Sequence, residues 1–325
     1  MDVEVDVRKA VWSRYWSHGV AHSCGGSYGN SYEGALAQFW RTAFAGLRPG
    51  ARVLDIATGN GALPQLLLAS AGGALSCDAI DLAQVEPQWV ASLTPAQRAQ
   101  CRFHPNQPAE ALPFPDGHFD MVVSQYGLEY TDLDRSVAEL LRVLAAGGKV
   151  CIVAHHAAAR PVRLAVAELE HLSWLHRDQG LLDVAQAMIE PMARAGTEAG
   201  RAALSTDQAA NALRSRFNAL QGEAGARANG SECPDVLFEV REAIVALLNL
   251  ALGSGRDAAE QAIARLRGEL ADSEVRLREL RDHALDETGA QRLCESLCRA
   301  GGSYSLQPIL DRSYLMGWSI VVERT

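Results

Sequence analysis

The sequence predicts an α/β protein with a mainly parallel sheet and a large helical insertion. Apolar runs of strand length alternate with helix-length segments from Ala51 to about residue 153, an order typical of a parallel sheet covered by helices on both faces. From Pro161 to about Leu285 only helical patterns occur, and strand patterns return over 303–309 and 316–323. The segment 161–285 must have structure of its own, because bare loops of that length are uncommon in compact domains.

The first part of the sheet can be predicted element by element. The run Arg52–Ile56 is apolar and rich in strand-forming residues, and a turn with two glycines follows it at 57–61. Residues 62–68 then have a helical composition. The further expected elements are strands at 75–80, 101–104, 119–124 and 147–153, and a helix at 132–144.

Two helices of the insertion have clear patterns. Apolar residues recur every three or four positions over 237–251 and again over 263–284, where Arg and Glu fill the positions between. The short segment Gly253–Asp257 separates the two helices. We expect them to pack as an antiparallel hairpin, and the alternative is pairing across a homodimer interface.

Composition limits the classes of protein that fit. The formal net charge of −9 argues against a broad basic surface for nucleic acid. No apolar run approaches the roughly 20 residues of a membrane span, and the acidic start Met1–Lys9 has no signal-peptide pattern, so we expect a cytoplasmic protein. The seven scattered cysteines indicate reduced thiols, and their spacing predicts no metal site.

The turn after the first strand predicts a nucleoside cofactor. Gly59 and Gly61 let the backbone approach a ligand at the start of the next helix, and Asp81 follows Gly61 at the spacing of a ribose-binding acid. A dinucleotide fingerprint would need a third glycine at Pro64. Asp55 would also repel a pyrophosphate, whereas the ammonium and sulfonium of S-adenosylmethionine suit a carboxylate.

The same stretch resembles the class I S-adenosylmethionine-dependent methyltransferases, particularly the ubiquinone/menaquinone-biosynthesis-like small-molecule group. The resemblance rests on four segments, which are Val53–Gly61, Ala79–Ala83, Ala109–Ser124 and Glu139–Val150. It implies a Rossmann-like sheet of seven strands, mostly parallel, whose last strand is antiparallel.

The resemblance also implies the residues that bind the cofactor. Those expected around its methionine part are Asp55, Ala57, Gly59 and Gly61. Asp81 would bind the ribose diol, Leu82 would pack on the adenine, and Ala109 and Glu110 would flank the adenine edge. Gln125 and Tyr126 would face the sulfonium and the substrate.

The sequence departs from the family pattern at two places. Ala57 stands where many relatives have glycine, and Gln107–Pro108 stands where the family often has Gly-Asp, whose Asp binds the adenine amino group. Either Asn106 or Gln107 replaces that contact, or the adenine pocket is looser.

Candidates for catalysis follow the fourth and fifth strands. His155 and His156 lie at the carboxyl edge of the sheet, where a histidine can take a proton from a substrate, and Glu129 is a further candidate. The alternative is that these are ordinary loop residues and that alignment of the substrate with the methyl group suffices.

Aromatic residues outside these motifs are further candidates for the pocket. In the N-terminal region, the residues that can close over the cofactor are Tyr15, Trp16, Tyr28 and Tyr32. We expect Tyr28 or Tyr32 to contact the cofactor carboxylate or the substrate. Trp174 of the insertion is a candidate for lining the substrate site, although core packing is its simpler role.

Together these observations predict a methyltransferase that uses S-adenosylmethionine on a small-molecule metabolite, with oxygen favoured as the acceptor atom. The alternatives are methylation of a protein or tRNA, and a catalytically silent cofactor-binding assembly protein. The predicted domains are an N-terminal helical cap (1–49), the methyltransferase domain (50–160 and 286–325) and the helical insertion (161–285), acting as a lid or a dimer arm.

Overall fold

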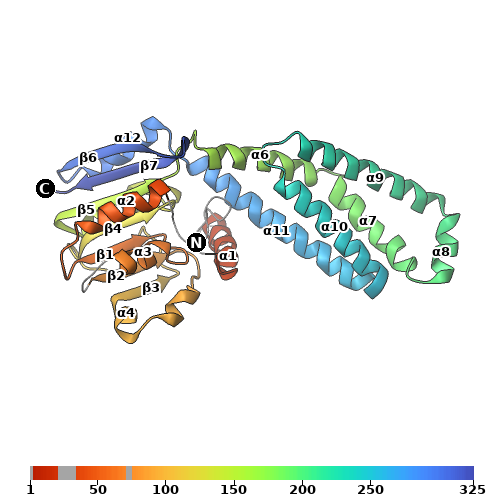
Figure 1. The fold of residues 1–325 in the computed structure, drawn as a ribbon, viewed down its shortest axis with the longest axis horizontal. Coiled ribbons are helices and arrows are strands. Elements are labelled where there is room, and N and C mark those ends of the chain that lie inside the picture. The colour runs from red at the N-terminus through yellow and green to blue at the C-terminus, as the bar shows by residue number, and fades with distance from the viewer. Residues whose placement is uncertain (1–2, 21–33, 71–74) are drawn as a thin grey trace. The chain divides into compact units, whose positions relative to one another are not determined.

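The computed structural model describes residues 3–20, 34–70 and 75–325, and the chain divides into two compact units. The first unit contains Met1–Val162 and Glu279–Thr325, and the second contains Arg163–Arg278. Figure 1 labels the elements of both units. The predicted Tyr28 and Tyr32 contacts lie outside the described residues.

The first unit is built on a seven-stranded sheet. Its strands are β1 (Arg52–Ile56), β2 (Ser76–Asp81), β3 (Cys101–Pro105), β4 (Phe119–Gln125), β5 (Leu144–Ala154), β6 (Ser303–Asp311) and β7 (Tyr314–Glu323). The strand order is β3-β2-β1-β4-β5-β7-β6, and β7 pairs antiparallel with both β5 and β6. The predicted Rossmann-like sheet is therefore confirmed, including its antiparallel last strand.

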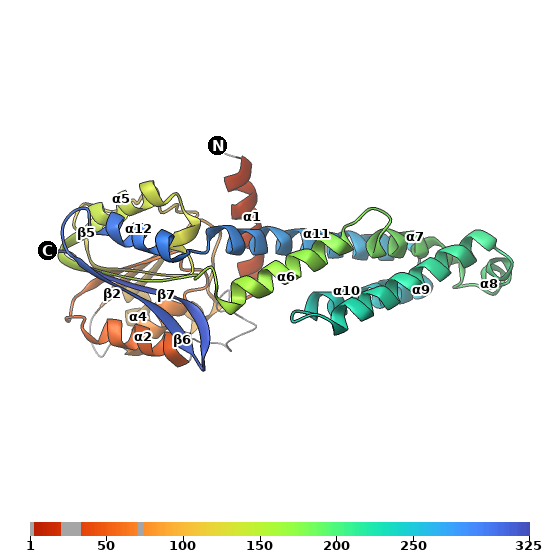
Figure 2. The same cartoon turned by 90° about the horizontal axis from the view of Figure 1, so that it is seen from above.

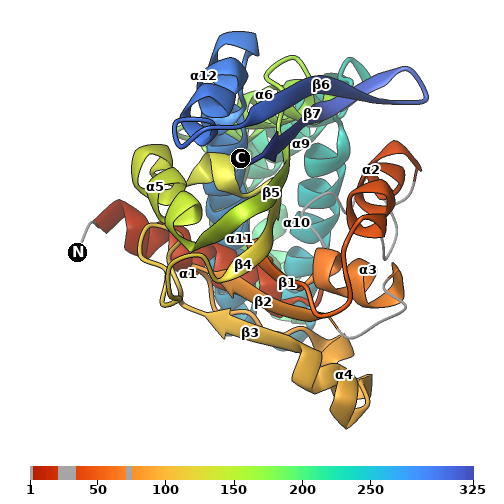
Figure 3. The same cartoon turned by 90° about the vertical axis from the view of Figure 1, so that its left-hand side faces the viewer.

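Helices cover both faces of this sheet. The helices of the unit are α1 (Val3–Ser17), α2 (Gly34–Ala45), α3 (Ala62–Ser70), α4 (Pro95–Gln100), α5 (Leu133–Val143) and α12 (Glu287–Leu297). Figure 3 shows α2 and α3 on one side of the sheet and α5 and α12 on the other. Two apolar clusters fill these layers, one around Trp40 and Leu67 and one around Leu140 and Leu293. The central strands are buried on both faces, which explains their nearly continuous apolar sequence.

Local sequence accounts for several element ends. The side chain of Asp132 accepts a hydrogen bond from Arg135 N at the start of α5, and Asp286 does the same for Gly289 N at the start of α12. The helix predicted at 132–144 ends at Val143, and β5 begins at Leu144 instead of residue 147. The strand starts earlier because Leu144 already pairs with Phe119 of β4, so the Gly147–Gly148 pair lies inside β5.

The second unit is helical, as predicted. Its helices are α6 (Arg160–Leu175), α7 (Leu181–Arg194), α8 (Glu198–Ser205), α9 (Gln208–Asn229), α10 (Asp235–Ser254) and α11 (Arg256–His283), of which α6 and α11 continue into the first unit. Helices α7, α9 and α10 pack against one another (Figure 2). Gly255, at a φ of 90°, separates α10 from α11, and both helices contribute to one apolar cluster. No described helix is long and apolar enough to span a membrane.

Candidate active site

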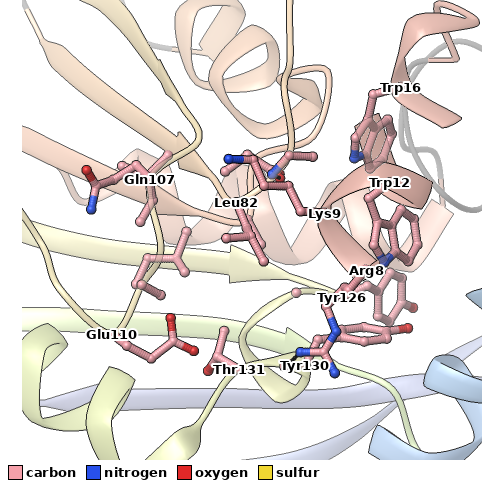
Figure 4. A pocket seen from close by; sticks show the side chains of 17 residues that line it. Arg8, Lys9, Trp12, Trp16, Leu82, Gln107, Glu110, Tyr126, Tyr130 and Thr131 are labelled. Carbon is pink, nitrogen blue, oxygen red and sulfur yellow. Dashed lines mark hydrogen bonds between the residues drawn. The ribbon is translucent and has the colours of Figure 1, made fainter. Parts of the chain in front are cut away.

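A pocket lies at the carboxyl ends of the parallel strands, between the sheet and α1 (Figure 4). The predicted site residues that line it are Ala57, Asp81, Leu82, Ala109, Glu110 and Tyr126. Trp16, which we predicted to close over the cofactor, also lines it. The lining residues that we did not predict are Arg8, Lys9, Trp12, Ile56, Ile80, Ala83, Gly127, Tyr130 and Thr131. The predicted Asp55, Gly59 and Gly61 are not among the lining residues. Of the two candidates for the missing adenine contact, Gln107 lines the pocket and Asn106 does not.

The turn between β1 and α3 is strongly curved. Ala57, Gly59 and Gly61 have φ values of 57°, 53° and 77°, a region that favours glycine. A Cβ atom on Gly59 would lie 2.6 Å from the Trp16 ring, and one on Gly61 would lie 2.7 Å from the Phe103 ring. Glycine is therefore required at both positions. The φ of Ala57 gives a physical reason for the glycine of many relatives at this place.

Asp81 ends β2 and holds the turn in place. One of its carboxylate oxygens accepts a hydrogen bond from Gly59 N at 2.8 Å, and the other accepts one from Ala83 N at 2.8 Å. Burial raises the pKa of Asp81 to about 6, although the two backbone N–H groups lower it. Asp81 thus joins the ends of β1 and β2 beside the pocket, as the predicted ribose contact requires.

Asp55 lies at the end of β1, and the polar side chain that acts on its carboxylate is that of Thr58. The Asp55 side chain is 1% exposed, and neither carboxylate oxygen has a hydrogen-bond partner among the described residues. The hydroxyl of Thr58 and the amide oxygen of Asn60 are also buried without a described partner. Burial is the largest cause that raises the pKa of Asp55 to about 8, and Asp81 adds to it while Thr58 lowers it. Unpaired buried oxygens are rare, and a cationic ligand fits them.

The loop after β3 shapes the far end of the pocket. The carboxylate of Glu110 accepts a hydrogen bond from Asp132 N at 2.9 Å. This bond connects the loop after β3 to the start of α5. The amide nitrogen of Gln107 donates to Pro108 O at 3.1 Å and to Ala111 O at 2.5 Å. Asn106 donates to the Gln84 side chain instead. Gln107 is thus bonded within its own loop, and Asn106 is bonded to the loop after β2. Of the two side chains, that of Gln107 lines the pocket (Figure 4).

Gln125 is held away from the pocket wall. Its amide oxygen accepts a hydrogen bond from the indole nitrogen of the fully buried Trp40, and Gln125 is not among the lining residues. Its amide nitrogen is buried without a hydrogen-bond partner among the described residues. The predicted contact between Gln125 and the cofactor therefore stays a prediction.

His155 and Glu129 form a buried pair, which the sequence did not indicate. One oxygen of Glu129 accepts hydrogen bonds from His155 N and from its Nδ1, both at 2.8 Å, and their side chains are 0% and 6% exposed. The His155 ring stacks on Tyr126 at 4.1 Å, and its Nδ1 is 3.4 Å from the Tyr130 hydroxyl. The pair thus lies directly behind two tyrosines of the pocket.

His156 is in a different environment from His155. Its ring stacks on Trp318 at 4.3 Å, its Nδ1 accepts a hydrogen bond from Ala158 N, and it does not line the pocket. Partial burial lowers the pKa of His156, while Glu287 raises it. Neither histidine lines the pocket, but His155 contacts the lining residues Tyr126 and Tyr130, whereas His156 contacts neither in these interactions.

Helix α1 closes one side of the pocket. Arg8 donates to Glu279 at 2.6 Å and to Tyr130 O at 2.8 Å, and Trp12 donates to the other oxygen of Glu279 at 3.2 Å. The side-chain amide of Asn60 donates to Trp16 O at 3.0 Å and so bonds the end of α1 to the turn after β1. The aromatic composition of this segment was a usable signal, but nothing in the sequence connects Arg8 with Glu279.

Trp174 belongs to the core of the second unit. It is 8% exposed, donates to Glu223 at 3.0 Å and carries the Arg177 guanidinium over its ring at 4.6 Å. These contacts account for its burial by packing. Its role in binding a substrate stays a prediction.

Known proteins resemble the first unit. Residues 53–148 match the family described as "Methyltransferase domain". The ubiquinone/menaquinone biosynthesis C-methyltransferase UbiE of Cupriavidus necator is 31% identical over 161 residues, which are 44% of this chain and 60% of that protein. The protein of the same name from Shewanella halifaxensis is 36% identical over 118 residues, or 34% of this chain and 44% of that protein.

A solved structure of Burkholderia thailandensis 1,6-didemethyltoxoflavin-N1-methyltransferase aligns with 48% of this chain and 66% of its own, at 20% identity and a TM-score of 0.37. The chain covers less than two thirds of the curated relatives that it matches. The sheet order, the turn after β1 and the family match agree with one another. Residues 53–148 thus match a methyltransferase domain, and this part of the chain is similar to C-methyltransferases named for ubiquinone/menaquinone biosynthesis.

Proposed function

We propose that this protein transfers the methyl group of S-adenosylmethionine to a small-molecule acceptor in the pocket between α1 and the sheet. The observation that carries the proposal is the set of buried oxygens of Asp55, Thr58 and Asn60 without a hydrogen-bond partner among the described residues, beside the turn that Asp81 holds in place. These residues lie in the same chain segment as the lining residues Ile56 and Ala57 but do not line the pocket themselves. A cationic amino-acid group is the kind of ligand that would satisfy them. A diphosphate would offer these oxygens no cationic group, which counts against a dinucleotide.

The residues at the strand ends would hold the cofactor. Asp81 would bind the ribose hydroxyls, Leu82 and Ala109 would pack on the adenine, and the turn with Gly59 and Gly61 would admit the methionine part. Gln107 replaces the missing family contact only if its amide turns away from Pro108 O and Ala111 O, so we propose a looser adenine pocket. S-adenosylmethionine supplies an electrophilic methyl group on a sulfonium.

The other end of the pocket would receive the acceptor. Trp12, Tyr126 and Tyr130 line it, so an acceptor there would be shielded from water by aromatic rings. We predicted oxygen as the acceptor atom, but the curated relatives are named as C-methyltransferases, which favours carbon. We propose His155, backed by Glu129, as the group that takes the acceptor proton, since this pair lies next to Tyr126 and Tyr130.

A binding experiment tests the proposal. We expect S-adenosylhomocysteine to raise the melting temperature of the purified protein, because a ligand of the folded state stabilises it. Asp81→Ala should weaken binding by about 1.5–3 kcal/mol, the scale of hydrogen bonds to a charged group. Asp116→Ala, which changes an exposed carboxylate paired with Arg142, is the matched control. Stabilisation by NAD in place of both cofactor forms would refute the proposal.

A second experiment separates an enzyme from a silent binder. Protein supplied with S-adenosylmethionine and an extract of small metabolites should release S-adenosylhomocysteine, which a silent binder cannot do. The same assay with tRNA or protein fractions tests the macromolecular alternatives. The cytoplasmic location, the homodimer and the lid role of the insertion remain predictions.

A further inference from the structure

Two carboxylates without a counter-charge lie at the proposed cofactor end of the pocket: Asp81 lines the pocket, and Asp55 is buried next to its lining residue Ile56. Asp55 and Asp81 are 1% and 8% exposed, and the described part of the chain provides neither with an ion pair to Lys, Arg or His. Asp81 is bonded by two backbone N–H groups, whereas both oxygens of Asp55 lack any partner in the same described residues. The neighbouring strand β4 faces Asp55 with Val123, which offers no polar group to it.

An ionised carboxylate in such a place is costly. A buried charge without a partner loses its hydration, so the group binds a proton instead. The groups that act on Asp55 besides its burial are Asp81 and the Thr58 hydroxyl, and the buried thiol of Cys77 lies near it. Burial raises the pKa of Asp55 to about 8, with Asp81 raising it further and Thr58 lowering it, and it raises that of Asp81 to about 6. At neutral pH the empty pocket therefore contains one carboxyl and one carboxylate.

We propose that the pocket exchanges the proton on Asp55 for the cationic amino-acid group of its cofactor. This exchange rests on the proposed function and would make cofactor binding depend on pH. Once the ammonium lies near Asp55, the ionised carboxylate has its counter-charge and the proton leaves to solvent. Affinity should then rise with pH, by up to tenfold per pH unit below about pH 8.

Calorimetry with S-adenosylhomocysteine measures the exchange without any acceptor. At pH 7 the binding heat is recorded in phosphate and in Tris, whose ionisation heats differ, and the difference gives the number of protons released. We expect the wild-type protein to release close to one proton per ligand. Asp55→Asn keeps the size of the side chain but holds no such proton, so its release should be near zero.

A matched ligand provides a second control. 5′-Methylthioadenosine has the adenosine but no amino-acid group, so we expect it to bind without proton release. Asp81→Asn should keep the release seen with S-adenosylhomocysteine, because Asp81 is already largely ionised at pH 7. Release that persists in Asp55→Asn, or wild-type binding without release, would overturn the exchange. Failure of S-adenosylhomocysteine to bind at all would instead refute the proposed function.

The empty protein offers an independent readout. The pKa of Asp55 is about 8 in the folded protein and about 4 in an unfolded chain, so the unfolded state releases the proton first as the pH rises. Stability of the empty protein should therefore fall between about pH 4 and pH 8. In Asp55→Asn this fall should be smaller, and an equal fall in both proteins would contradict the assignment of the proton to Asp55.

Discussion

The two ends of the pocket are assembled from different distances along the chain. At the cofactor end, Asp55, Gly59 and Asp81 lie at or just past the ends of two adjacent parallel strands, so the sheet register itself brings them together. At the acceptor end, Arg8 of α1 bonds to Glu279 near the end of α11, 271 residues away. The first end is encoded by short motifs, and the second exists only once the chain has folded.

The His155–Glu129 pair shows how much the acceptor end depends on tertiary contacts. Glu129 comes from the loop after β4 and His155 from the end of β5, and these two strands are neighbours in the sheet. Tyr126, in a left-handed conformation at a φ of 53°, covers the histidine ring. A comparison of the two ends by mutation should therefore find larger structural effects at the acceptor end.

The largest effect is expected for Glu129→Ala. The change removes the acceptor of two hydrogen bonds from His155 and leaves these donors buried. We expect the free energy of unfolding to fall by about 3–5 kcal/mol, as for other broken buried pairs. Urea denaturation measures it, and Glu129→Gln, which keeps an acceptor oxygen, should lose clearly less. Equal losses in both variants would show that charge and not hydrogen bonding holds the pair.

The second largest effect is expected for Gly127→Ala, at the contact between the loop after β4 and the turn after β1. A Cβ atom on Gly127 would clash with the Cβ of Ala57, so Gly127→Ala should cost about 1–3 kcal/mol of unfolding free energy. In an Ala57→Gly background the clashing atom is absent and glycine accepts the positive φ. The same Gly127→Ala change should then cost less than about 1 kcal/mol. Additive costs would mean that these loops do not touch in solution.

The smallest effect is expected for the contact of α1 with α11. The side chains of Arg8 and Glu279 are 20% and 11% exposed, so their pair is better shielded than a surface salt bridge. A double-mutant cycle with Arg8→Ala and Glu279→Ala should give a coupling energy of about 1 kcal/mol. The exposed pair Lys149–Glu323 is the control and should couple by less than about 0.5 kcal/mol. Equal coupling would remove the distinction between the two pairs.

The sequence by itself determined the sheet, the helical nature of 161–285 and the turn at the proposed cofactor end of the pocket. The reason is that apolar periodicity, the Gly59–Gly61 turn and the spacing to Asp81 are local properties, and parallel strands align their carboxyl ends. Asp81 therefore lies beside the turn and accepts a hydrogen bond from Gly59 N, while its predicted contact with a ribose stays a prediction. The helix end at Val143 was placed one residue too late, because boundary positions depend on weak local preferences.

Only the tertiary structure decided the rest of the site. It separated His155 from its neighbour His156, paired it with Glu129, and directed Gln125 toward Trp40. It also brought Arg8 and Trp12 to the pocket wall. Adjacent residues at a strand end point in opposite directions, and contacts between distant elements depend on packing that no local pattern records. The residues at the proposed cofactor end were therefore predictable from local motifs, whereas the contacts at the proposed acceptor end required the tertiary structure.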